Sequence, residues 1–352
     1  MMVVEDSAVI REFLVHVLGS APGIQVVGTA NDGEEAVEAV QRLKPDLVTM
    51  DIHMPRIDGL EATRRIMETY PVPIVIVSGA SDSEVNLMFQ ATEAGAVAFV
   101  PRPTGFGHPT HEATTGELIK TVKLMSEIKV IRRWPRRPVA TNACPSPQVS
   151  LRMPQKFKVV AIGSSTGGPS VLQTILAGLP KDFNVPILIV QHMTPDFIKG
   201  FIDWLSLTSV LPIRLAVHGE NIQPGYVYVA ADDAHMEIKR GGRITLTRAP
   251  PENGLRPSVS HLFRSVAEAF GNEAVAGLLT GMGRDGANEL KLLKDKGAAT
   301  FAQDKDSSVV HGMAGEAIKL NAATWVLPPE RIAPLLARLV NPEQRNASDE
   351  HA

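Results

Sequence analysis

The sequence contains a single cysteine, Cys144, among 352 residues. One thiol excludes an internal disulfide and any metal cluster built from several cysteines. Because Cys144 lies among prolines and polar residues, we do not expect it to act as a nucleophile in a cleft. Catalytic chemistry, if present, must therefore come from other side chains.

Long apolar runs are also missing, since no stretch approaches the ~20 residues that span a bilayer. Residues 1–6 have neither the basic region nor the apolar core of a signal peptide. We therefore expect a cytoplasmic protein that is not embedded in a membrane. The formal net charge of −3 gives the protein no overall positive potential that would attract nucleic acid. We therefore do not expect nucleic acid as a partner.

The chain is long enough for two domains of ordinary size, and short apolar runs alternate with helical patterns along it. In the first hundred residues, the expected strands are residues 3–4, 24–27, 47–50, 74–77 and 97–100. Only four residues precede Glu5, so we expect the first strand to be unusually short. A helix expected from about residue 116 to 131 closes this unit.

A run with four arginines over residues 132–138 and a proline-bearing stretch follow, and together they predict a linker over residues 132–155. We interpret the arginines as solvated linker charge, with docking on an acidic partner as the alternative. Beyond the linker, the expected strands are residues 159–162, 187–190, 213–217, 227–229 and 274–279. The sequence thus predicts an α/β protein with two doubly wound parallel-sheet domains, residues 1–131 and 156–340, and a polar tail over residues 341–352.

Charged and hydroxyl side chains follow four strands of the first domain: Glu5 and Asp6, then Asp51, Ser78 and Arg102. In a parallel sheet these ends meet at one edge, where ligands bind. Three carboxylates there would repel one another unless a cation such as Mg²⁺ lay among them. Asp51 is the best nucleophile for an aspartyl phosphate, with Ser78 and Arg102 holding the phosphoryl oxygens. Helix capping is the alternative at any single position, but four consistent strand ends favour phosphorylation.

This pattern resembles the receiver domain of response regulators across nearly the whole first domain. The matching residues are Glu5, Asp6, the run of residues 51–55, Asp58, Gly59, Ser78 and Phe99. The resemblance implies a flavodoxin-like fold, a histidine kinase as phosphodonor, and a rotamer switch at Phe99. Arg102 departs from the lysine of that family, and a planar guanidinium is not equivalent to a compact ammonium group. We expect phosphorylation to occur but switching to be weaker or kinetically altered.

The second domain places a serine, a histidine and an aspartate after three strands. Ser165 lies in the small-residue turn of residues 163–168, His192 follows the strand of residues 187–190, and Asp285 lies in a glycine-rich turn after residues 274–279. Such a set can supply a nucleophile, a base and an orienting acid. Each residue alone has a structural explanation, as a helix cap, a strand-end histidine or a turn aspartate. Together they favour serine hydrolysis.

The turn after the first strand of this domain lacks the lysine of a phosphate-binding P-loop. It leads into a helix, and backbone N–H groups at a helix N-terminus can stabilise an oxyanion. The candidate donors are the backbone N–H groups of Thr166, Gly167, Gly168 and Met282.

Several motifs of this domain resemble the chemotaxis protein-glutamate methylesterases, the CheB family. They are residues 163–168, 191–193, 224–225, 230–232, 235–237, 256–259 and 279–286. The resemblance implies a Rossmann-like methylesterase domain with Ser165 as the nucleophile. Its implied substrates are methylated glutamates, and glutamines to be deamidated, on methyl-accepting chemoreceptors. It implies no cofactor for hydrolysis, so Mg²⁺ would belong to the receiver alone.

Two other functions remain open from the residues. The same triad could act on a small diffusible ester or amide, or the second domain could only bind a partner. A DNA-binding output is disfavoured, because the second domain has a hydrolase-like turn and no basic recognition helix.

Overall fold

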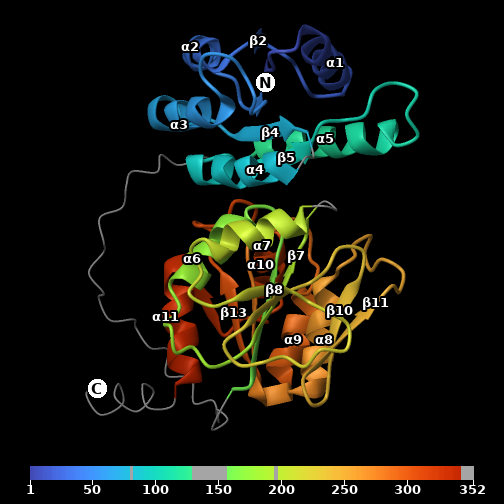
Figure 1. Cartoon of the computed structure of the whole chain (residues 1–352), viewed down its shortest axis with the longest axis vertical. Helices are drawn as coiled ribbons and strands as arrows, with labels where there is room; N and C mark the ends of the chain where they lie inside the picture. Colours follow the sequence, from blue (N-terminus) through green and yellow to red (C-terminus); the bar gives the residue numbers. More distant parts are fainter. Residues whose placement is uncertain (80–81, 129–156, 194–196, 342–352) are drawn as a thin grey trace. The chain divides into compact units, whose positions relative to one another are not determined.

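The computed structural model describes residues 1–79, 82–128, 157–193 and 197–341, with the backbone alone over residues 82–86. The chain divides into two compact units, Met1–Pro147 and Gln148–Ala352 (Figure 1). The predicted linker and all but the first residue of the predicted polar tail lie outside the described residues. No helix in the described part of the chain is long and apolar enough to cross a membrane.

The first unit is built on a five-stranded sheet of strand order β2-β1-β3-β4-β5, and all of its strand pairs are parallel. Its strands are β1 (Met2–Val4), β2 (Gly28–Ala30), β3 (Val48–Met50), β4 (Ile74–Ser78) and β5 (Ala98–Pro101). Its helices are α1 (Ala8–Gly19), α2 (Gly33–Leu43), α3 (Gly59–Thr69), α4 (Asp82–Ala94) and α5 (His111–Ser126).

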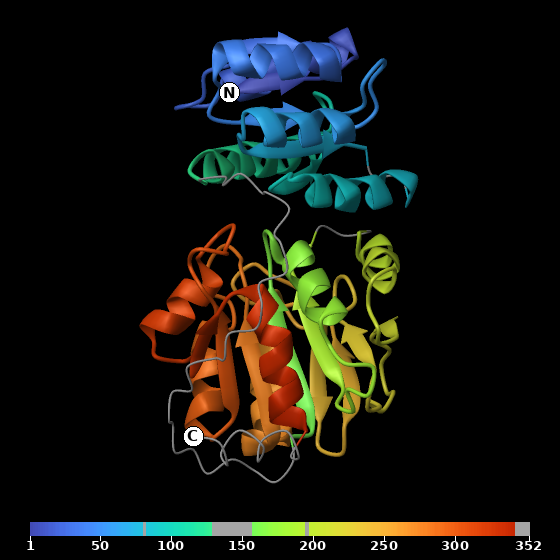
Figure 2. The same cartoon turned by 90° about the vertical axis from the view of Figure 1, so that its left-hand side faces the viewer.

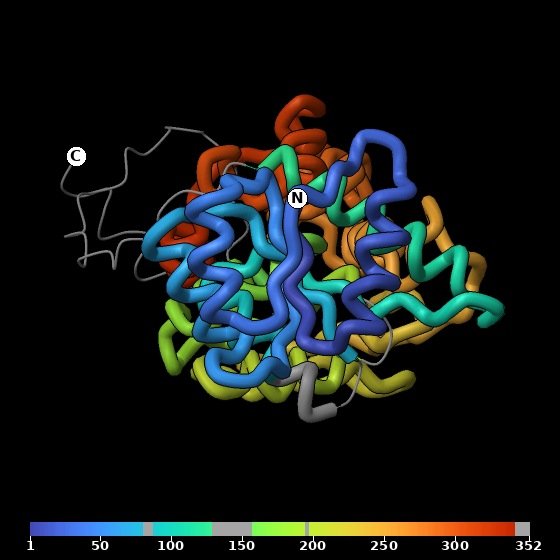
Figure 3. The backbone as a smooth tube through the Cα atoms, turned by 90° about the horizontal axis from the view of Figure 1, so that it is seen from above, coloured from blue at the N-terminus to red at the C-terminus, as the bar shows by residue number. Residues whose placement is uncertain are grey.

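Helices cover both faces of this sheet, as the view from above also shows (Figure 3). Helices α2, α3 and α4 pack side by side on one face. Helices α1 and α5 meet on the other, where the rings of Phe13 and His111 lie 6.0 Å apart between centroids. This arrangement confirms the predicted doubly wound fold.

Two elements of this unit differ from the prediction. The strand expected at residues 24–27 begins only at Gly28, because β1 is three residues long and offers Gly28 its first ladder partner at Met2. The closing helix begins at His111 rather than near residue 116. Thr115 lies at the start of the second turn, where its hydroxyl donates to the carbonyl of His111 at 2.7 Å. The helix ends at Ser126, before the predicted end.

The second unit contains a seven-stranded sheet of order β14-β13-β12-β6-β7-β9-β8, again with every pair parallel. Its strands are β6 (Val159–Ser164), β7 (Ile187–Gln191), β8 (Ile213–Leu215), β9 (Val227–Val229), β12 (Ala274–Leu278), β13 (Ala299–Gln303) and β14 (Trp325–Leu327). Its α-helices are α6 (Gly168–Ala177), α7 (Ile198–Ser206), α8 (Val259–Ala269), α9 (Ala287–Asp295), α10 (Met313–Lys319) and α11 (Pro329–Val340), and Gly271–Glu273 forms a 3₁₀ turn.

Helices also cover both faces of this larger sheet (Figure 2). Helices α8, α9 and α10 pack together on one face, and α6 packs with α7 and α11 on the other. Strands β13 and β14 and the antiparallel hairpin of β10 (His235–Lys239) and β11 (Arg243–Thr247) were not predicted. The hairpin packs on α8 through buried residues such as Met236 and Ile238.

Candidate active site and phosphorylation site

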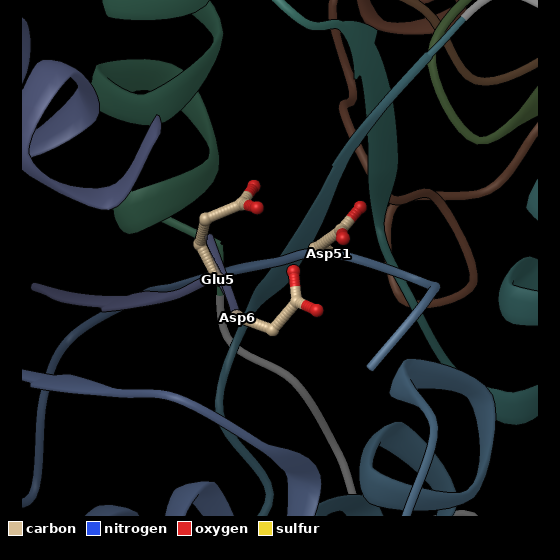
Figure 4. Close-up of side chains that lie close together, drawn as sticks. All are labelled: Glu5, Asp6 and Asp51. Carbon is tan, nitrogen blue, oxygen red and sulfur yellow. The ribbon is translucent and has the colours of Figure 1, made fainter. Parts of the chain in front are cut away.

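Three carboxylates lie together at the carboxyl edge of the first sheet (Figure 4). Strands β1 and β3 pair in parallel with Val4 opposite Met50, so Glu5, Asp6 and Asp51 emerge side by side. One oxygen of each carboxylate lies within 4.8 Å of the others, with Glu5 and Asp51 buried and Asp6 exposed. The structure therefore brings these three predicted residues together.

Burial makes the ionised form of two of these acids costly. Burial, reinforced by the charge of Asp51, raises the pKa of Glu5 to about 7. Burial also raises the pKa of Asp51, although Arg102 opposes this effect. The Oδ1 atom of Asp51 is buried and accepts no hydrogen bond from any described residue, although it forms an ion pair with Arg102. A hard divalent cation binds such oxygens and relieves their repulsion, so this donor set fits Mg²⁺.

Arg102 lies directly against this acidic cluster. One guanidinium nitrogen, Nη2, lies 3.1 Å from Glu5 Oε2 and 3.2 Å from Asp51 Oδ1. Its backbone N–H continues the pairing of β5 with β4 by donating to the carbonyl of Ser78, which is itself buried. The ring of Phe99, by contrast, packs edge-on against Phe89 of α4, with 5.7 Å between centroids. Arg102 thus contacts two of the acids, whereas Phe99 contacts α4.

Ser165 lies in a sharp turn between β6 and α6. Its N–H donates to the carbonyl of Thr280 at 3.0 Å, which ties the turn to the end of β12. Gly167 has a left-handed backbone with φ of +77°, and a Cβ there would lie 2.6 Å from Val309. A Cβ on Gly168 would lie 2.2 Å from Gln191 Oε1. Both glycines are therefore required by the close approach of neighbouring segments.

His192 and Asp285 form a hydrogen-bonded pair beside this turn. Strands β6 and β7 pair with Ser164 opposite Gln191, so Ser165 and His192 emerge next to each other. The N–H of His192 donates to the carbonyl of Ser164 at 2.9 Å. Its Nε2 lies 2.9 Å from Asp285 Oδ2 in a largely buried contact. The three predicted residues thus meet at one edge of the sheet.

The carboxylate of Asp285 is held at the N-terminus of α8 by several donors. Ser258 Oγ and Ser260 Oγ donate to Oδ1 at 2.8 and 2.7 Å, and the N–H of Val259 donates to Oδ2 at 2.6 Å. Burial pushes the pKa of Asp285 upward, but the hydrogen bonds from His192, Ser260 and Val259 outweigh it and lower the pKa to about 2. Asp285 is therefore an anion at neutral pH.

The four predicted oxyanion donors are not equivalent. The N–H of Gly168 already donates to the carbonyl of Ser165 at 2.8 Å, which removes it from the candidate set. The N–H groups of Thr166, Gly167 and Met282 donate to no acceptor among the described residues. Three donors therefore remain available at the end of the sheet that carries Ser165.

Sequence reasoning assigned no role to several residues that hold this site together. Ser258 and Ser260 bind Asp285, and Gln191 bonds the main chains of Ser165 and His192. Ser258 directly precedes a strongly periodic helix, so an N-cap was detectable. The Ser258 hydroxyl also donates a hydrogen bond to Asp285, which lies 27 residues further along the chain. No local sequence pattern reveals a contact of this kind.

Two family models match the chain. The model described as CheB methylesterase matches residues 160–336, and the response regulator receiver domain matches residues 1–109. The first range includes Ser165, His192 and Asp285, and covers half of the chain. The chain belongs to the CheB methylesterase family. The receiver match includes the acidic cluster and Arg102.

Curated relatives match this family member over nearly its whole length. A protein-glutamate methylesterase/protein-glutamine glutaminase of Nitrosospira multiformis is 58% identical over 96% of both chains. A protein of the same description from Geobacter metallireducens is 59% identical over 96% of this chain and 98% of its own. The crystal structure of the Thermotoga maritima CheB methylesterase catalytic domain is 39% identical, with a TM-score of 0.51 over 53% of this chain and all of that one.

Proposed function

We propose that this chain is a phosphorylation-regulated protein-glutamate methylesterase that also deamidates glutamines. The observation that carries the proposal is the hydrogen bond of 2.9 Å between His192 and Asp285 beside the turn that bears Ser165. The names of relatives 58% and 59% identical over nearly the full chain support the same activity. In this proposal residues 1–131 form the regulatory domain, 132–155 the linker, 156–340 the catalytic domain and 341–352 a tail.

Ser165 is the nucleophile, His192 the general base and Asp285 the orienting acid. Because Nε2 of His192 donates to Asp285, Nδ1 is the ring nitrogen that accepts the Ser165 proton. The Ser165 oxygen bonds to the ester carbonyl carbon, and the carbonyl oxygen becomes an oxyanion. The free N–H groups of Thr166, Gly167 and Met282 stabilise that charge.

The first half-reaction ends when the carbon–methoxy bond breaks and methanol leaves with the proton held by His192. Water then attacks the acyl-serine, His192 takes its proton, and Ser165 is regenerated with release of the glutamate carboxylate. Deamidation follows the same steps with ammonia as the leaving group. Asp285 remains ionised throughout, because its pKa of about 2 lies far below neutral pH.

The first unit controls this activity through phosphorylation of Asp51 by a histidine kinase. Glu5, Asp6 and Asp51 would hold Mg²⁺, which would supply positive charge for the phosphoryl oxygens. Ser78 and Arg102 bind those oxygens, and Phe99 on β5 responds as the switch residue. Phosphorylation shifts a population in which the receiver restricts access to Ser165 toward one in which access is free.

The substrates are methylated glutamates of methyl-accepting chemoreceptors, and the protein acts in the cytoplasm. The decisive measurement is methanol release from methylated receptor membranes by the wild type and by Ser165→Ala. We expect Ser165→Ala to abolish release, and full turnover by this variant would refute the proposal. Faster turnover of small generic esters than of receptors would instead favour a hydrolase of small esters. An unchanged basal rate after removal of residues 1–140 would refute restriction by the receiver.

A further inference from the structure

Gln191 is a buried polar residue at the end of β7, directly before His192, and the residue is only 3% exposed. Its amide makes three hydrogen bonds. Oε1 accepts from Ser164 Oγ at 2.7 Å, while Nε2 donates to the carbonyl of Ser165 at 2.9 Å and to that of His192 at 2.8 Å. One side chain thus bonds the residue before the nucleophile, the nucleophile and the base.

The two bonds from Nε2 link the main chains of the two residues that must exchange a proton. The carbonyl of Ser165 also accepts from the N–H of Gly168, so the turn is held from both of its sides. The N–H of His192 donates to Ser164, so both backbone groups of His192 are bonded as well. These hydrogen bonds fix the main chains of Ser165 and His192, and therefore the points from which their side chains extend.

The surroundings of the Gln191 amide leave it no alternative placement. The first residue of α6, Gly168, packs so closely that a Cβ would lie 2.2 Å from Gln191 Oε1. Each hydrogen of the Nε2 group has its own carbonyl partner, and Oε1 has the Ser164 hydroxyl. A buried amide that satisfies its donors in this way is rigid.

We propose that Gln191 is a positioning residue of the hydrolase, which sets the separation of Ser165 and His192 through its amide donors. This inference rests on the proposed function. A misplacement of about 1 Å between reacting groups costs on the order of 10²-fold in rate. Loss of the two donors should therefore lower kcat far more than it changes substrate binding.

The test compares Gln191→Met, which keeps the length of the side chain without its donors, with Ser164→Ala, which removes only the bond to Oε1. Thr300→Val is the matched control. Thr300 is also fully buried and hydrogen bonded, to Thr324 at 3.1 Å, but it lies near the amino-terminal end of β13, away from Ser165. The full chain is used throughout, and urea denaturation reports the stability of each variant.

We expect Gln191→Met to lower kcat for methanol release by roughly 10- to 100-fold with KM within about 2-fold of wild type. Labelling of Ser165 by a fluorophosphonate should slow in parallel, because it needs the same nucleophile and base. Ser164→Ala should lose less of kcat than Gln191→Met, since both donors of Gln191 remain. Thr300→Val should lose stability without loss of kcat.

The inference is overturned if Gln191→Met loses no more kcat than Thr300→Val, or if its loss lies in KM. If Gln191→Met does not fold, Gln191→Asn replaces it, because its shorter amide stays polar but cannot reach both carbonyls. Failure of the proposed function is separate: it would show as turnover by Ser165→Ala, whatever the Gln191 variants do.

Discussion

Replacement of Asp285 by asparagine should destabilise the second unit in a way that depends on pH. Asp285 is buried, and its pKa of about 2 lies well below the ordinary 3.8. A difference of this size corresponds to about 2.5 kcal/mol of folding free energy in favour of the ionised form. Because the folded-state pKa is depressed, this stability is present above about pH 4 and is lost as the pH falls toward 2.

The measurement is the free energy of unfolding in urea for the wild type and Asp285→Asn between pH 7 and pH 3. Tryptophan fluorescence is followed in a Trp134→Phe background, so that the signal comes from Trp204 and Trp325, which are buried in the second unit. At pH 7 the variant should be less stable by at least about 2 kcal/mol, and at pH 3 about 1 kcal/mol of the difference should have disappeared. Methanol release at pH 7 should fall on the order of 10⁴-fold, because His192 loses the anion that sets its tautomer.

A stability difference that stays constant from pH 7 to pH 3 would refute this reasoning. It would mean that the hydrogen bonds to Asp285, and not its negative charge, provide the stability. Ser258→Ala serves as a control, since it removes one donor, at 2.8 Å from Oδ1, and leaves the carboxylate in place. That variant should lose less stability at pH 7 and much less activity than Asp285→Asn.

Three further predictions concern both units. Gly168→Ala should lower kcat at least about 10-fold, since its Cβ would lie 2.2 Å from Gln191 Oε1. The control Gly116→Ala, whose Cβ would have nothing within 4 Å, should keep its kcat, and equal activity of the two variants would contradict the prediction. Arg102→Lys should strengthen or speed activation of methanol release by a small phosphodonor, and identical activation would show that the guanidinium is immaterial. Glu5→Gln should raise the melting temperature of the first unit at pH 8 without Mg²⁺, because the raised pKa of Glu5 makes its ionisation unfavourable in the folded state. The gain in melting temperature should shrink toward pH 4.5, and a gain independent of pH would argue against this reasoning.

The positions of the main site residues were predictable from sequence because parallel strands deliver their carboxyl ends to one edge. Short apolar runs marked β3, β6 and β7, and the residues after them are Asp51, Ser165 and His192. Pairing of Ser164 with Gln191 then makes the last two neighbours. The strand order and pairing alone place these residues at one edge of their sheets.

The supporting contacts were not predictable, because they join segments far apart in sequence. Ser260 and Asp285 are separated by 25 residues, and Ser164 and Gln191 by 27. The same reason explains the displaced strand at Gly28, whose start is set by the length of β1 and not by its own apolar residues. Local patterns specify which residues end a strand, whereas packing specifies what each side chain then meets.

Asp285 and Glu5 show what that packing does to similar acids. Both are buried, at 3% and 1% exposure, yet the pKa of Asp285 lies at about 2 and that of Glu5 at about 7. Asp285 accepts hydrogen bonds from four residues, among them two serine hydroxyls. Glu5 accepts one from Ser7 and one from Arg102, and faces the charge of Asp51. The donors around Asp285 are already in place for its ionised form. Around Glu5, burial and the charge of Asp51 outweigh the effects of Arg102 and Ser7, so a further cation would stabilise the ionised form of Glu5.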